Sequence, residues 1–224
     1  MALLTLDHDP MYDAGVVRLA FELLKMVPPT KFGTPRQKNV LRQRLAICLG
    51  IAAADWDLQA PPDREGEVTR FPFSAWLDDL RSPFNVGSIV RTAEAYGFEA
   101  VFSSLDTPGI DHPRARRTAM GAEAHLVVEA WSLEQLRDLW SHKPVFALEL
   151  GGIPVDRFEF PDHGLMLVGG EEVGLSPEAL SWADASAGRV SLPLYGRKAS
   201  LNVGVAFGVV AAAWTQRFFR DEKP

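Results

Sequence analysis

The sequence predicts an α/β fold: a mostly parallel sheet with helices on both faces. From Phe71 onward, short apolar segments alternate with helical patterns, which is typical of a parallel sheet covered on both sides. Three polar or glycine-bearing turns each lie between an expected strand and an expected helix. The 224 residues, 47% hydrophobic and 23% charged, suffice for a full core. We therefore expect one α/β domain over residues 66–224.

The first 65 residues predict a small helical extension. Apolar side chains recur at helical spacing over residues 16–24 and 40–49, and three prolines and a glycine separate these stretches. From Lys25 to Ala54 there are six basic residues and no acidic one, so this segment carries +6 while the net charge of the chain is −6. Such a patch is typical of a surface that steers RNA, and equally of a solvated helix face beside a loop. The extension is thus expected to hold RNA or to serve in packing.

Composition also limits the class of protein. The single cysteine, Cys48, cannot form an intramolecular disulfide, so nothing indicates an oxidising compartment. No basic-then-apolar leader is visible, and the longest apolar run, Val203 to Trp214, is shorter than the ~20 residues that span a bilayer. The five histidines share no metal-ligand spacing. We expect a soluble, cytoplasmic protein with no membrane partner and no metal.

The elements of the α/β domain follow from apolar runs, periodicity and turn residues. We expect strands near Phe73–Leu80, Ala100–Ser103, Ala124–Val128, Val145–Leu148, Leu165–Val168 and Val190–Leu192. Helices are expected at Val86–Tyr96, Leu133–Leu139, Pro177–Ala183 and Val203–Phe219. The three turns lie after the first, fifth and sixth of these strands. Since ligands bind at the carboxyl ends of the strands in open α/β sheets, we expect the turns to form one pocket.

The first turn leads into the helix at Val86–Tyr96. Asn85 is an N-cap candidate, because its side-chain oxygen can accept a hydrogen bond from an amide two or three residues later. Arg91 lies four residues after Gly87, so its guanidinium is expected over a helix face without bulky side chains, with space there for a ligand. The alternative is an ordinary solvated arginine.

The second turn follows the apolar strand Leu165–Val168. Its glycines, Gly169 and Gly170, suit a ligand that lies against the main chain. Ser176 before a proline predicts a capped helix start. Capping does not explain Glu171, for which a surface carboxylate and an ion pair with an arginine such as Arg91 are the alternatives.

The third turn runs from Leu192 to Asn202. Pro193 ends a strand, Gly196 allows a sharp bend, and Ser200 and Asn202 are both able to cap the helix that follows. That helix is apolar on several sides and contains two glycines that permit close contact. We therefore expect it to be buried on several sides and to take part in a subunit contact.

Together the three turns resemble the three motifs of the SpoU branch of the SPOUT methyltransferases. The matching residues are Asn85-x-Gly87-x-x-x-Arg91-Thr92-Ala93-Glu94, Gly169-x-Glu171-x-x-Gly174-Leu175-Ser176 and Leu192-Pro193-x-x-Gly196-x-x-x-Ser200-Leu201-Asn202-Val203. A weaker family element, Arg117-Thr118-Ala119-Met120-Gly121-Ala122, lies between the first two. The resemblance covers roughly residues 70 to 220.

The resemblance implies a fold, an activity and a set of residues. It implies transfer of a methyl group from S-adenosylmethionine to a ribose 2′-hydroxyl of tRNA or rRNA, a trefoil knot at the carboxyl end, and a homodimer. By resemblance Gly169, Leu192 and Leu201 contact the cofactor, and Leu148 is a further candidate. Arg91 corresponds to the catalytic residue beside the ribose, with the pocket fixed by Asn85, Glu171, Ser200 and Asn202.

The expected chemistry suits an arginine. Methyl transfer to a hydroxyl is an in-line displacement that gains from alignment and from stabilising the developing alkoxide. A guanidinium with a pKa above ~12 is almost never neutral near pH 7, which argues against Arg91 as a general base. We expect Arg91 to bind the ribose oxygen and a nearby phosphate together, while a phosphate oxygen or water accepts the proton.

Two departures from the family pattern bear on the site. Gly204 stands where a second serine usually follows the third motif, and Glu172 stands where glycine is common. Neither removes an expected catalytic group. Two other functions stay as alternatives: a non-catalytic RNA-binding or assembly protein that keeps the fold, and a nucleotide-dependent α/β enzyme. The second lacks support, since the chain has neither Gly-x-Gly-x-x-Gly nor a Walker-type loop.

Overall fold

The computed structural model describes residues 37, 40, 41, 44, 45, 49 and 66–220, with only the backbone of residues 219 and 220. The chain divides into two compact units, Met1–Pro62 and Asp63–Pro224. In the first unit the described residues 37, 40, 41, 44 and 45 have helical backbone, and Leu45 is buried. The rest of the expected extension, including its first helix, Cys48 and most of the basic segment, lies outside the described residues.

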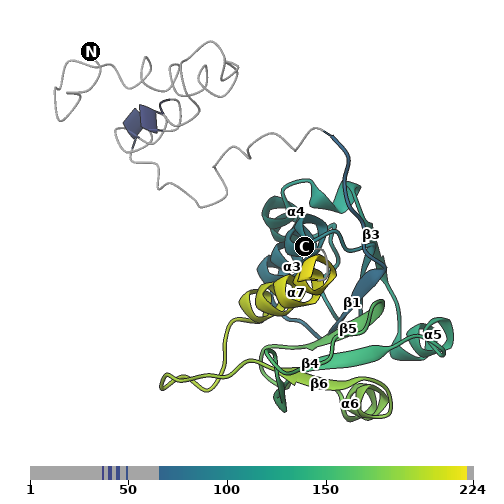
Figure 1. The fold of residues 1–224 in the computed structure, drawn as a ribbon. Coiled ribbons are helices and arrows are strands. Elements are labelled where there is room, and N and C mark those ends of the chain that lie inside the picture. Colours follow the sequence, from purple (N-terminus) through teal and green to yellow (C-terminus); the bar gives the residue numbers. More distant parts are fainter. Residues whose placement is uncertain (1–36, 38–39, 42–43, 46–48, 50–65, 221–224) are drawn as a thin grey trace, which may run out of the picture. The chain divides into compact units, whose positions relative to one another are not determined.

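The second unit is built on a six-stranded sheet (Figure 1). Its strand order is β3-β2-β1-β5-β4-β6, and every neighbouring pair is parallel. The strands are β1 (Phe73–Asp78), β2 (Ala100–Ser103), β3 (Val127–Ala130), β4 (Val145–Pro154), β5 (Gly164–Gly169) and β6 (Gly188–Ser191). The predicted parallel sheet is confirmed.

Helices cover both faces of this sheet, as the sequence predicts. One face carries α3 (Pro83–Ala95), α4 (Pro113–Ala119) and α7 (Val203–Arg220) (Figure 1). The other face carries α5 (Leu133–Leu139) and α6 (Pro177–Asp184). A short 3₁₀ turn, η4 (Ala122–Ala124), follows α4. The result is a three-layer arrangement with the sheet in the middle.

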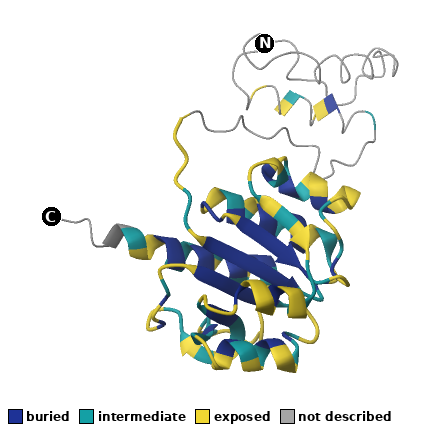
Figure 2. Cartoon of the chain, turned by 90° about the vertical axis from the view of Figure 1, so that its right-hand side faces the viewer, coloured by how far each residue is buried: buried dark blue, intermediate teal, exposed yellow. Residues whose placement is uncertain are grey.

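Strand β1 shows how the sequence builds two cores. Because side chains alternate across a strand, Phe73 and Leu77 face the layer of α3 and α7, whereas Trp76 faces the layer of α5 and α6. Phe73 stacks on the buried Trp214 of α7, with ring centroids 3.8 Å apart. The central strands are accordingly buried along nearly their whole length (Figure 2). Both faces of the sheet are thus closed, and its ends remain for a site.

Helix α7 packs against α3 along the side that carries its two glycines. A side chain at Gly204 would contact the Ser88 hydroxyl, and one at Gly208 would contact the Thr92 methyl group. Buried aromatic residues of α7 face the sheet, so the predicted close contact and burial on more than one side are confirmed. A further side remains open, where Val205 is 55% exposed. No helix in the described part of the chain is long and apolar enough to cross a bilayer.

Three element predictions need correction. Helix α4 was not predicted, because its buried side chains are the two alanines Ala115 and Ala119, which give no strong apolar period. Ala124 ends the 3₁₀ turn rather than starting a strand, and β3 begins only at Val127, opposite Ala100. Strand β4 continues past Leu148 to Pro154, because it pairs with β6 again after a register shift. The other predicted elements match within a few residues.

Candidate active site

The three motif turns lie at the same end of the sheet, where the carboxyl ends of the strands meet. Strands β1 and β5 are direct neighbours, with Asp78 opposite Gly169 at their carboxyl ends. The turns that follow them are therefore adjacent, and the Asp78 carboxylate accepts a hydrogen bond from the amide of Ser176, at 2.9 Å. Strand β6 ends at the same edge, two strands from β5. This is where open α/β sheets bind ligands.

Asn85 joins all three motifs through its side-chain amide. It is 5% exposed, although it lies in the first turn of α3. Its Nδ2 donates to Glu171 Oε1 at 2.6 Å, and its Oδ1 accepts from Asn202 Nδ2 at 3.0 Å. The prediction that Asn85 caps the helix is wrong, because its side chain is used between segments rather than within α3. The three predicted residues Asn85, Glu171 and Asn202 are in direct contact.

The hydrogen bonds in this cluster have a fixed direction. A carboxylate only accepts, so the NH₂ group of Asn85 must face Glu171 and its carbonyl oxygen must face Asn202. Asn202 then donates, which leaves its own Oδ1 to accept from the amides of Gly204, at 3.0 Å, and Val205, at 3.2 Å. The predicted capping of α7 by Asn202 is thus confirmed. The chain of donors leads from the start of α7 to Glu171.

Glu171 is an exposed carboxylate that accepts hydrogen bonds from amide groups of Arg81, Ser82 and Asn85. Its Oε2 accepts from the amide of Arg81 at 2.9 Å, and its Oε1 accepts from the amide of Ser82 at 3.3 Å. Partial burial raises the pKa of this carboxyl, but the hydrogen bonds from Arg81, Asn85 and neighbouring amides outweigh burial, so the pKa lies below its usual value. Its position at the amino end of α3 also favours a negative charge.

The caps of α3 and α6 share one sequence pattern. In α3 the cap is Ser82, whose hydroxyl accepts from the amide of Asn85 at 3.4 Å and which precedes Pro83. In α6 the cap is Ser176 before Pro177, as predicted from the sequence. The same serine-proline pair stands before α3, so the sequence contained a signal for Ser82 as the cap, although Asn85 was predicted instead.

The glycines of the first two motifs serve the packing of the protein itself. A Cβ at Gly87 would collide with the carbonyl of Ala115 in α4, so α4 occupies the helix face that was expected to be open for a ligand. A Cβ at Gly169 would collide with the backbone of Gly174, and one at Gly170 with the carbonyl of Asp79. These glycines are required because main chain approaches main chain there. At Gly87 this corrects the interpretation of the helix face as space for a ligand.

The second motif is a closed loop. Gly170 and Gly174 exchange both backbone hydrogen bonds, at 3.2 and 3.0 Å. Behind the loop, the Glu149 carboxylate accepts from the amides of Leu150, at 2.9 Å, and Leu175, at 3.4 Å. The backbone from Gly169 to Leu175 is therefore fixed by short-range contacts. Sequence reasoning missed Glu149, since a glutamate at the end of an apolar strand has no distinctive spacing.

The predicted cofactor residues surround the ends of three strands. Leu148 is half-buried in β4, opposite Val168 of β5, which immediately precedes Gly169. Leu192 follows β6 directly and packs partly against the core. Leu201 is 45% exposed and lies outside regular structure, as does the exposed Ser200. The structure brings Leu148, Gly169 and Leu192 to one edge, whereas Ser200 and Leu201 lie on a solvent-exposed segment.

Arg91 lies apart from the Asn85 cluster. It is six residues after Asn85 in α3, which separates them by about 9 Å along the helix axis, and its side chain is exposed. Its Nη1 donates to the sulfur of Met120, just beyond the end of α4. Position 91 therefore offers a guanidinium to solvent beside the cluster rather than within it.

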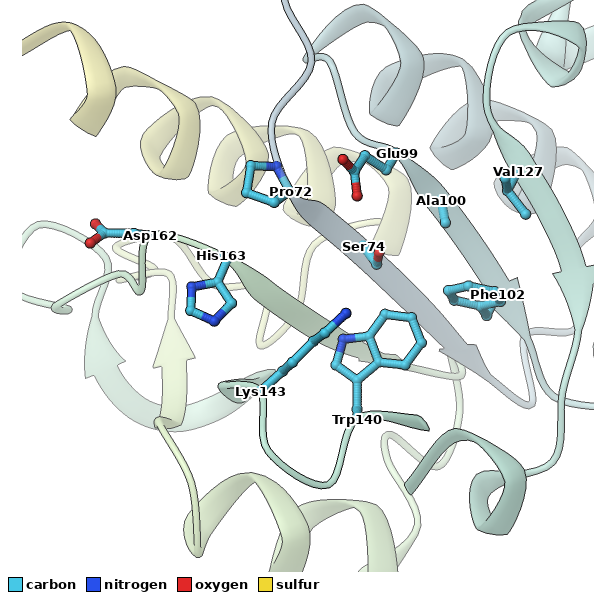
Figure 3. A pocket seen from close by; sticks show the side chains of 10 residues that line it. All are labelled: Pro72, Ser74, Glu99, Ala100, Phe102, Val127, Trp140, Lys143, Asp162 and His163. Atoms are coloured by element: carbon cyan, nitrogen blue, oxygen red, sulfur yellow. The ribbon is translucent and has the colours of Figure 1, made fainter. Parts of the chain in front are cut away.

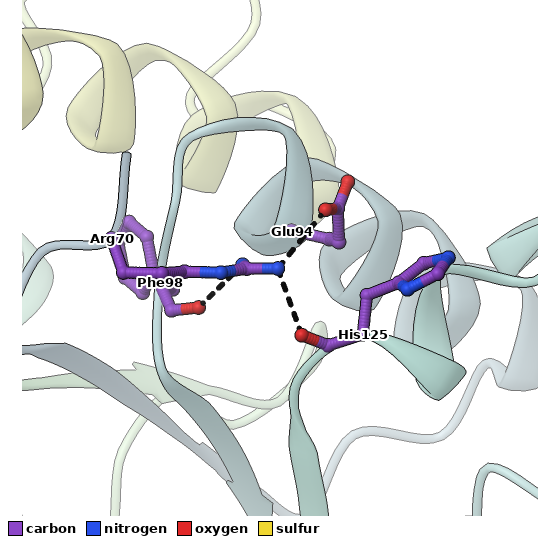
Figure 4. A network of polar contacts seen from close by, with 4 residues as sticks. All are labelled: Arg70, Glu94, Phe98 and His125. Atoms are coloured by element: carbon purple, nitrogen blue, oxygen red, sulfur yellow. Dashed lines mark hydrogen bonds and ion pairs between the residues drawn. The ribbon is translucent and has the colours of Figure 1, made fainter. Parts of the chain in front are cut away.

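Glu94, the last residue of the first motif, has a structural partner. Arg70, just before β1, donates to Glu94 Oε1 at 3.3 Å and to the carbonyls of Phe98, at 3.1 Å, and His125, at 2.8 Å (Figure 4). One guanidinium thereby joins the entry of β1 to the end of α3 and to the segment before β3. Arg70 carries no sequence signal for this, because its three partners are far away in the chain.

Two cavities lie away from the motif cluster. One, of about 630 Å³, is at the amino ends of the strands, where Ser74 lies at its floor and Lys143 sits 4.9 Å from the Trp140 ring (Figure 3). The other, of about 520 Å³, lies between the segment after β4 and the second half of α7. Neither is lined by a motif residue. Among the described residues, no group of three His, Cys, Asp or Glu side chains is placed to hold a metal ion.

Comparison with known proteins identifies a family for the second unit. Residues 72–212 match the sequence profile of the SpoU rRNA methylase family. The chain is 32% identical over 141 residues to the 23S rRNA (guanosine-2′-O-)-methyltransferase RlmB of Acinetobacter baylyi, covering 59% of this chain and 55% of the relative. It is 29% identical over 138 residues to the 23S rRNA (guanosine(2553)-2′-O)-methyltransferase RlmP of Bacillus subtilis, covering 60% and 54%. The matched part thus spans about half the length of these relatives.

A solved structure has the same fold. The SpoU methyltransferase AviRb of Streptomyces viridochromogenes, crystallised with the cofactor AdoMet, superposes with a TM-score of 0.61. The superposition covers 68% of this chain and 60% of that one, at 23% sequence identity. At this identity the likeness establishes the α/β fold of the second unit.

Proposed function

Because the chain belongs to the SpoU rRNA methylase family, we propose that it transfers a methyl group from S-adenosylmethionine to a ribose 2′-hydroxyl of RNA. The observation that carries this proposal is the Asn85 cluster, which ties the three motif segments together at the carboxyl edge of the sheet. Relatives named as methyltransferases of 23S rRNA, and others named as tRNA/rRNA methyltransferases, support an RNA substrate, ribosomal or transfer. The activity is assigned to residues 66–224 and to the cytoplasm.

The residues at this edge suit S-adenosylmethionine. Its adenine ring has apolar faces and a polar rim, and it is met best by apolar side chains with main-chain donors and acceptors beside them. Large apolar side chains are exposed here, with Leu150 58% and Val173 69% exposed, and AviRb was crystallised with this cofactor. Gly169, Leu192 and Leu201, with Leu148 beside them, would hold the cofactor. When bound, it supplies an electrophilic methyl group on a sulfonium.

The protein's own groups would then align and stabilise the acceptor. Arg91 would bind the ribose oxygen and a neighbouring phosphate, lowering the pKa of the hydroxyl while a phosphate oxygen or water takes its proton. Asn85, with Glu171 and Asn202, fixes the start of α3 relative to the start of α7. Ser200, exposed on the same segment as Leu201, would contact the RNA or the cofactor.

The direct test is methyl transfer. RNA from cells that lack this protein should accept labelled methyl from S-adenosylmethionine when purified protein is added, and mapping should place the label on a ribose 2′-oxygen. RNA from cells that contain the protein should already carry the mark and accept little. Calorimetry that detects RNA binding but no binding of S-adenosylmethionine would instead favour a non-catalytic RNA-binding protein that keeps the fold.

Arg91→Lys tests the role of the guanidinium. Lysine keeps the charge but loses the planar fork, so methyl transfer should fall by roughly 10²-fold or more. Binding of S-adenosylmethionine should be unchanged, since Arg91 is apart from the residues assigned to the cofactor. Turnover close to that of the wild type would contradict the assignment.

The open side of α7 supports a homodimer. Val205 and Val209, four residues apart, are 55% and 45% exposed on one side of the helix. An exposed apolar stripe of this kind is typical of a subunit contact. Val205→Glu combined with Val209→Glu should turn a dimer in sedimentation experiments into a monomer. A wild-type monomer at micromolar concentration would contradict the dimer.

We also assign a trefoil knot to the carboxyl end and an RNA-holding role to residues 1–65. The return of the chain from β6, at the edge of the sheet, to α7 beside α3 supports a crossing of segments there. An experimental trace of residues 145–220 should show α7 passing through a chain loop. Removing residues 1–62 should weaken RNA binding without loss of cofactor binding, because the first unit is separate and contains the basic segment.

A further inference from the structure

The weaker element between the first two motifs, residues 117–122, has no role in the function described so far. It contains Met120, whose sulfur accepts a hydrogen bond from Arg91 Nη1. Met120 is half-buried and immediately follows α4. The contact therefore links the guanidinium assigned to the ribose with a residue of a different helix.

The place of Met120 is fixed by the packing of α4 on α3. Gly87 allows the carbonyl of Ala115 to approach α3 so closely that no side chain would fit between them. Arg91 lies one turn after Gly87 in α3, and Met120 lies five residues after Ala115 in α4. The Met120 amide donates to the carbonyl of Arg116 at 3.0 Å, so it remains bonded to the helix. The two contacts, Gly87 with Ala115 and Arg91 with Met120, are thus consecutive along one helix interface.

The backbone conformation of Met120 sets the direction in which its side chain leaves the helix. Its φ is +54°, a left-handed conformation that is uncommon for a residue other than glycine, and Gly121 follows with a φ of +92°. This pair of residues ends α4 and turns the chain into η4. A side chain at such a helix end leaves in a direction that a continued helix could not give it. Here that direction leads to Arg91.

A thioether suits a temporary partner for a functional arginine. It is a weak, uncharged acceptor, so it can orient a guanidinium without neutralising it. A carboxylate in the same place would form a charge-assisted pair that competes with the ribose oxygen and phosphate. The nearby acidic residues of the motifs are used elsewhere, Glu94 by Arg70 and Glu171 by backbone amides and Asn85.

We propose that Met120 is a positioning residue, which holds the Arg91 guanidinium in place before RNA binds. This inference rests on the proposed function, because it assumes that Arg91 acts on the ribose. Holding a long side chain in advance lowers the conformational entropy that is lost when the substrate is bound. The effect belongs to turnover with RNA and not to binding of S-adenosylmethionine.

Two substitutions of similar size separate positioning from packing. Met120→Leu keeps the volume and the backbone preference but removes the acceptor, and such exchanges are well tolerated where only packing counts. Met120→Gln is less apolar but restores an acceptor, an oxygen one bond farther along the side chain. We expect kcat to fall roughly 5- to 50-fold in Met120→Leu and to be closer to wild type in Met120→Gln. The reverse order, with leucine more active than glutamine, would overturn the proposal.

A second measurement does not depend on activity. In protein labelled with ¹⁵N in arginine, the Arg91 side-chain NH signal, assigned by its loss in Arg91→Lys, should shift and sharpen toward a freely rotating guanidinium in Met120→Leu. It should stay close to wild type in Met120→Gln. An unchanged signal in Met120→Leu would show that the sulfur does not hold Arg91. If the Arg91 signal differs between wild type and Met120→Leu but the wild type transfers no methyl group, the contact exists and the proposed function has failed.

Discussion

The two loops assigned to the cofactor differ sharply in how the protein holds them. The loop from Gly170 to Gly174 closes on itself with two backbone hydrogen bonds, and collisions around its glycines leave no room for a side chain. The segment from Leu192 to Leu201 is largely exposed. Its Tyr195 is 94% exposed, and a Cβ at Gly196 would meet nothing within 4 Å. The loop from Gly170 to Gly174 is therefore fixed by contacts within the protein, whereas the segment from Leu192 to Leu201 presents its groups to solvent.

This difference separates two uses of glycine that look alike in the sequence. In the closed loop, glycine is required by the protein's own main chain, so substitution should affect folding. In the open segment, glycine has no steric role in the described structure, so substitution should affect only what binds there. The contrast also predicts where a ligand changes the protein: the open segment should gain order, while the closed loop should change little.

The largest effect is expected from a matched pair of glycine substitutions. Gly170→Ala places a Cβ against the carbonyl of Asp79, which cannot move without disturbing β1, so it should destabilise the protein by about 3 kcal/mol or prevent folding. Gly196→Ala should change the free energy of unfolding by less than about 1 kcal/mol. The change would be stabilising if it comes mainly from the smaller backbone freedom of alanine in the unfolded chain. Urea unfolding measures both. Equal losses in the two variants would remove the contrast between the loops.

The next effect concerns Asn85. Asn85→Ala removes the donor to Glu171 and the acceptor for Asn202 at a buried position, and should cost about 1–3 kcal/mol of unfolding free energy. A double-mutant cycle with Asn202→Ala gives the coupling between the two residues. Because Asn202 donates to Asn85, we expect a coupling energy of at least about 0.5 kcal/mol between them. Additive losses would mean that the first and third motifs are fixed independently.

A smaller effect, which depends on pH, is expected at Glu171. Its pKa in the folded protein is below the ordinary value of 4.5. A lowered carboxyl pKa stabilises the fold above the unfolded pKa, and this contribution is lost as the pH falls through the folded pKa. Wild type should therefore exceed Glu171→Gln in stability at pH 7, and the difference should shrink below pH 4.5. A difference that stays constant from pH 7 to pH 3 would show that the charge of Glu171 is not involved.

The smallest effect on stability is expected from Ser200→Ala. The side chain is exposed, and the cap of α7 comes from Asn202 instead. The free energy of unfolding should change by less than about 0.5 kcal/mol, while methyl transfer should fall if Ser200 contacts the cofactor or RNA. Thermal unfolding and transfer rates on the same sample compare the two. A clear loss of stability would mean that the open segment is more firmly packed than its exposure indicates.

Much of the fold follows from local sequence patterns. Apolar runs and turn residues predict the parallel sheet and the covering of both faces, and Ser176-Pro177 gives the start of α6. Helix α4 could not be found in this way, because a seven-residue helix that buries two alanines has almost no apolar period. The extended β4 was missed because its second pairing with β6 depends on a partner far away in the sequence.

The residues of the Asn85 cluster were predicted, but the contacts among them were not. Asn85, Glu171 and Asn202 were identified by the family resemblance, yet an asparagine near a helix start gives the same local signal whether it caps or bridges segments. The interpretation of Gly87 as ligand space failed for the same reason, since its neighbour Ala115 belongs to a helix that the pattern did not show. Contacts between distant segments are fixed by tertiary packing, which spacing within one segment does not encode.

Amide hydrogen exchange with and without S-adenosylhomocysteine, the product form of the methyl donor, tests whether the cofactor binds at the carboxyl ends of the strands. We expect strong slowing of exchange in residues 192–202 and slight slowing in residues 170–174, where Gly170 and Gly174 are already hydrogen-bonded. No change is expected around Ser74, Trp140 and Lys143 at the opposite end of the strands. Slowing at that opposite cavity, or none at residues 192–202 despite binding, would contradict a cofactor site at the carboxyl edge.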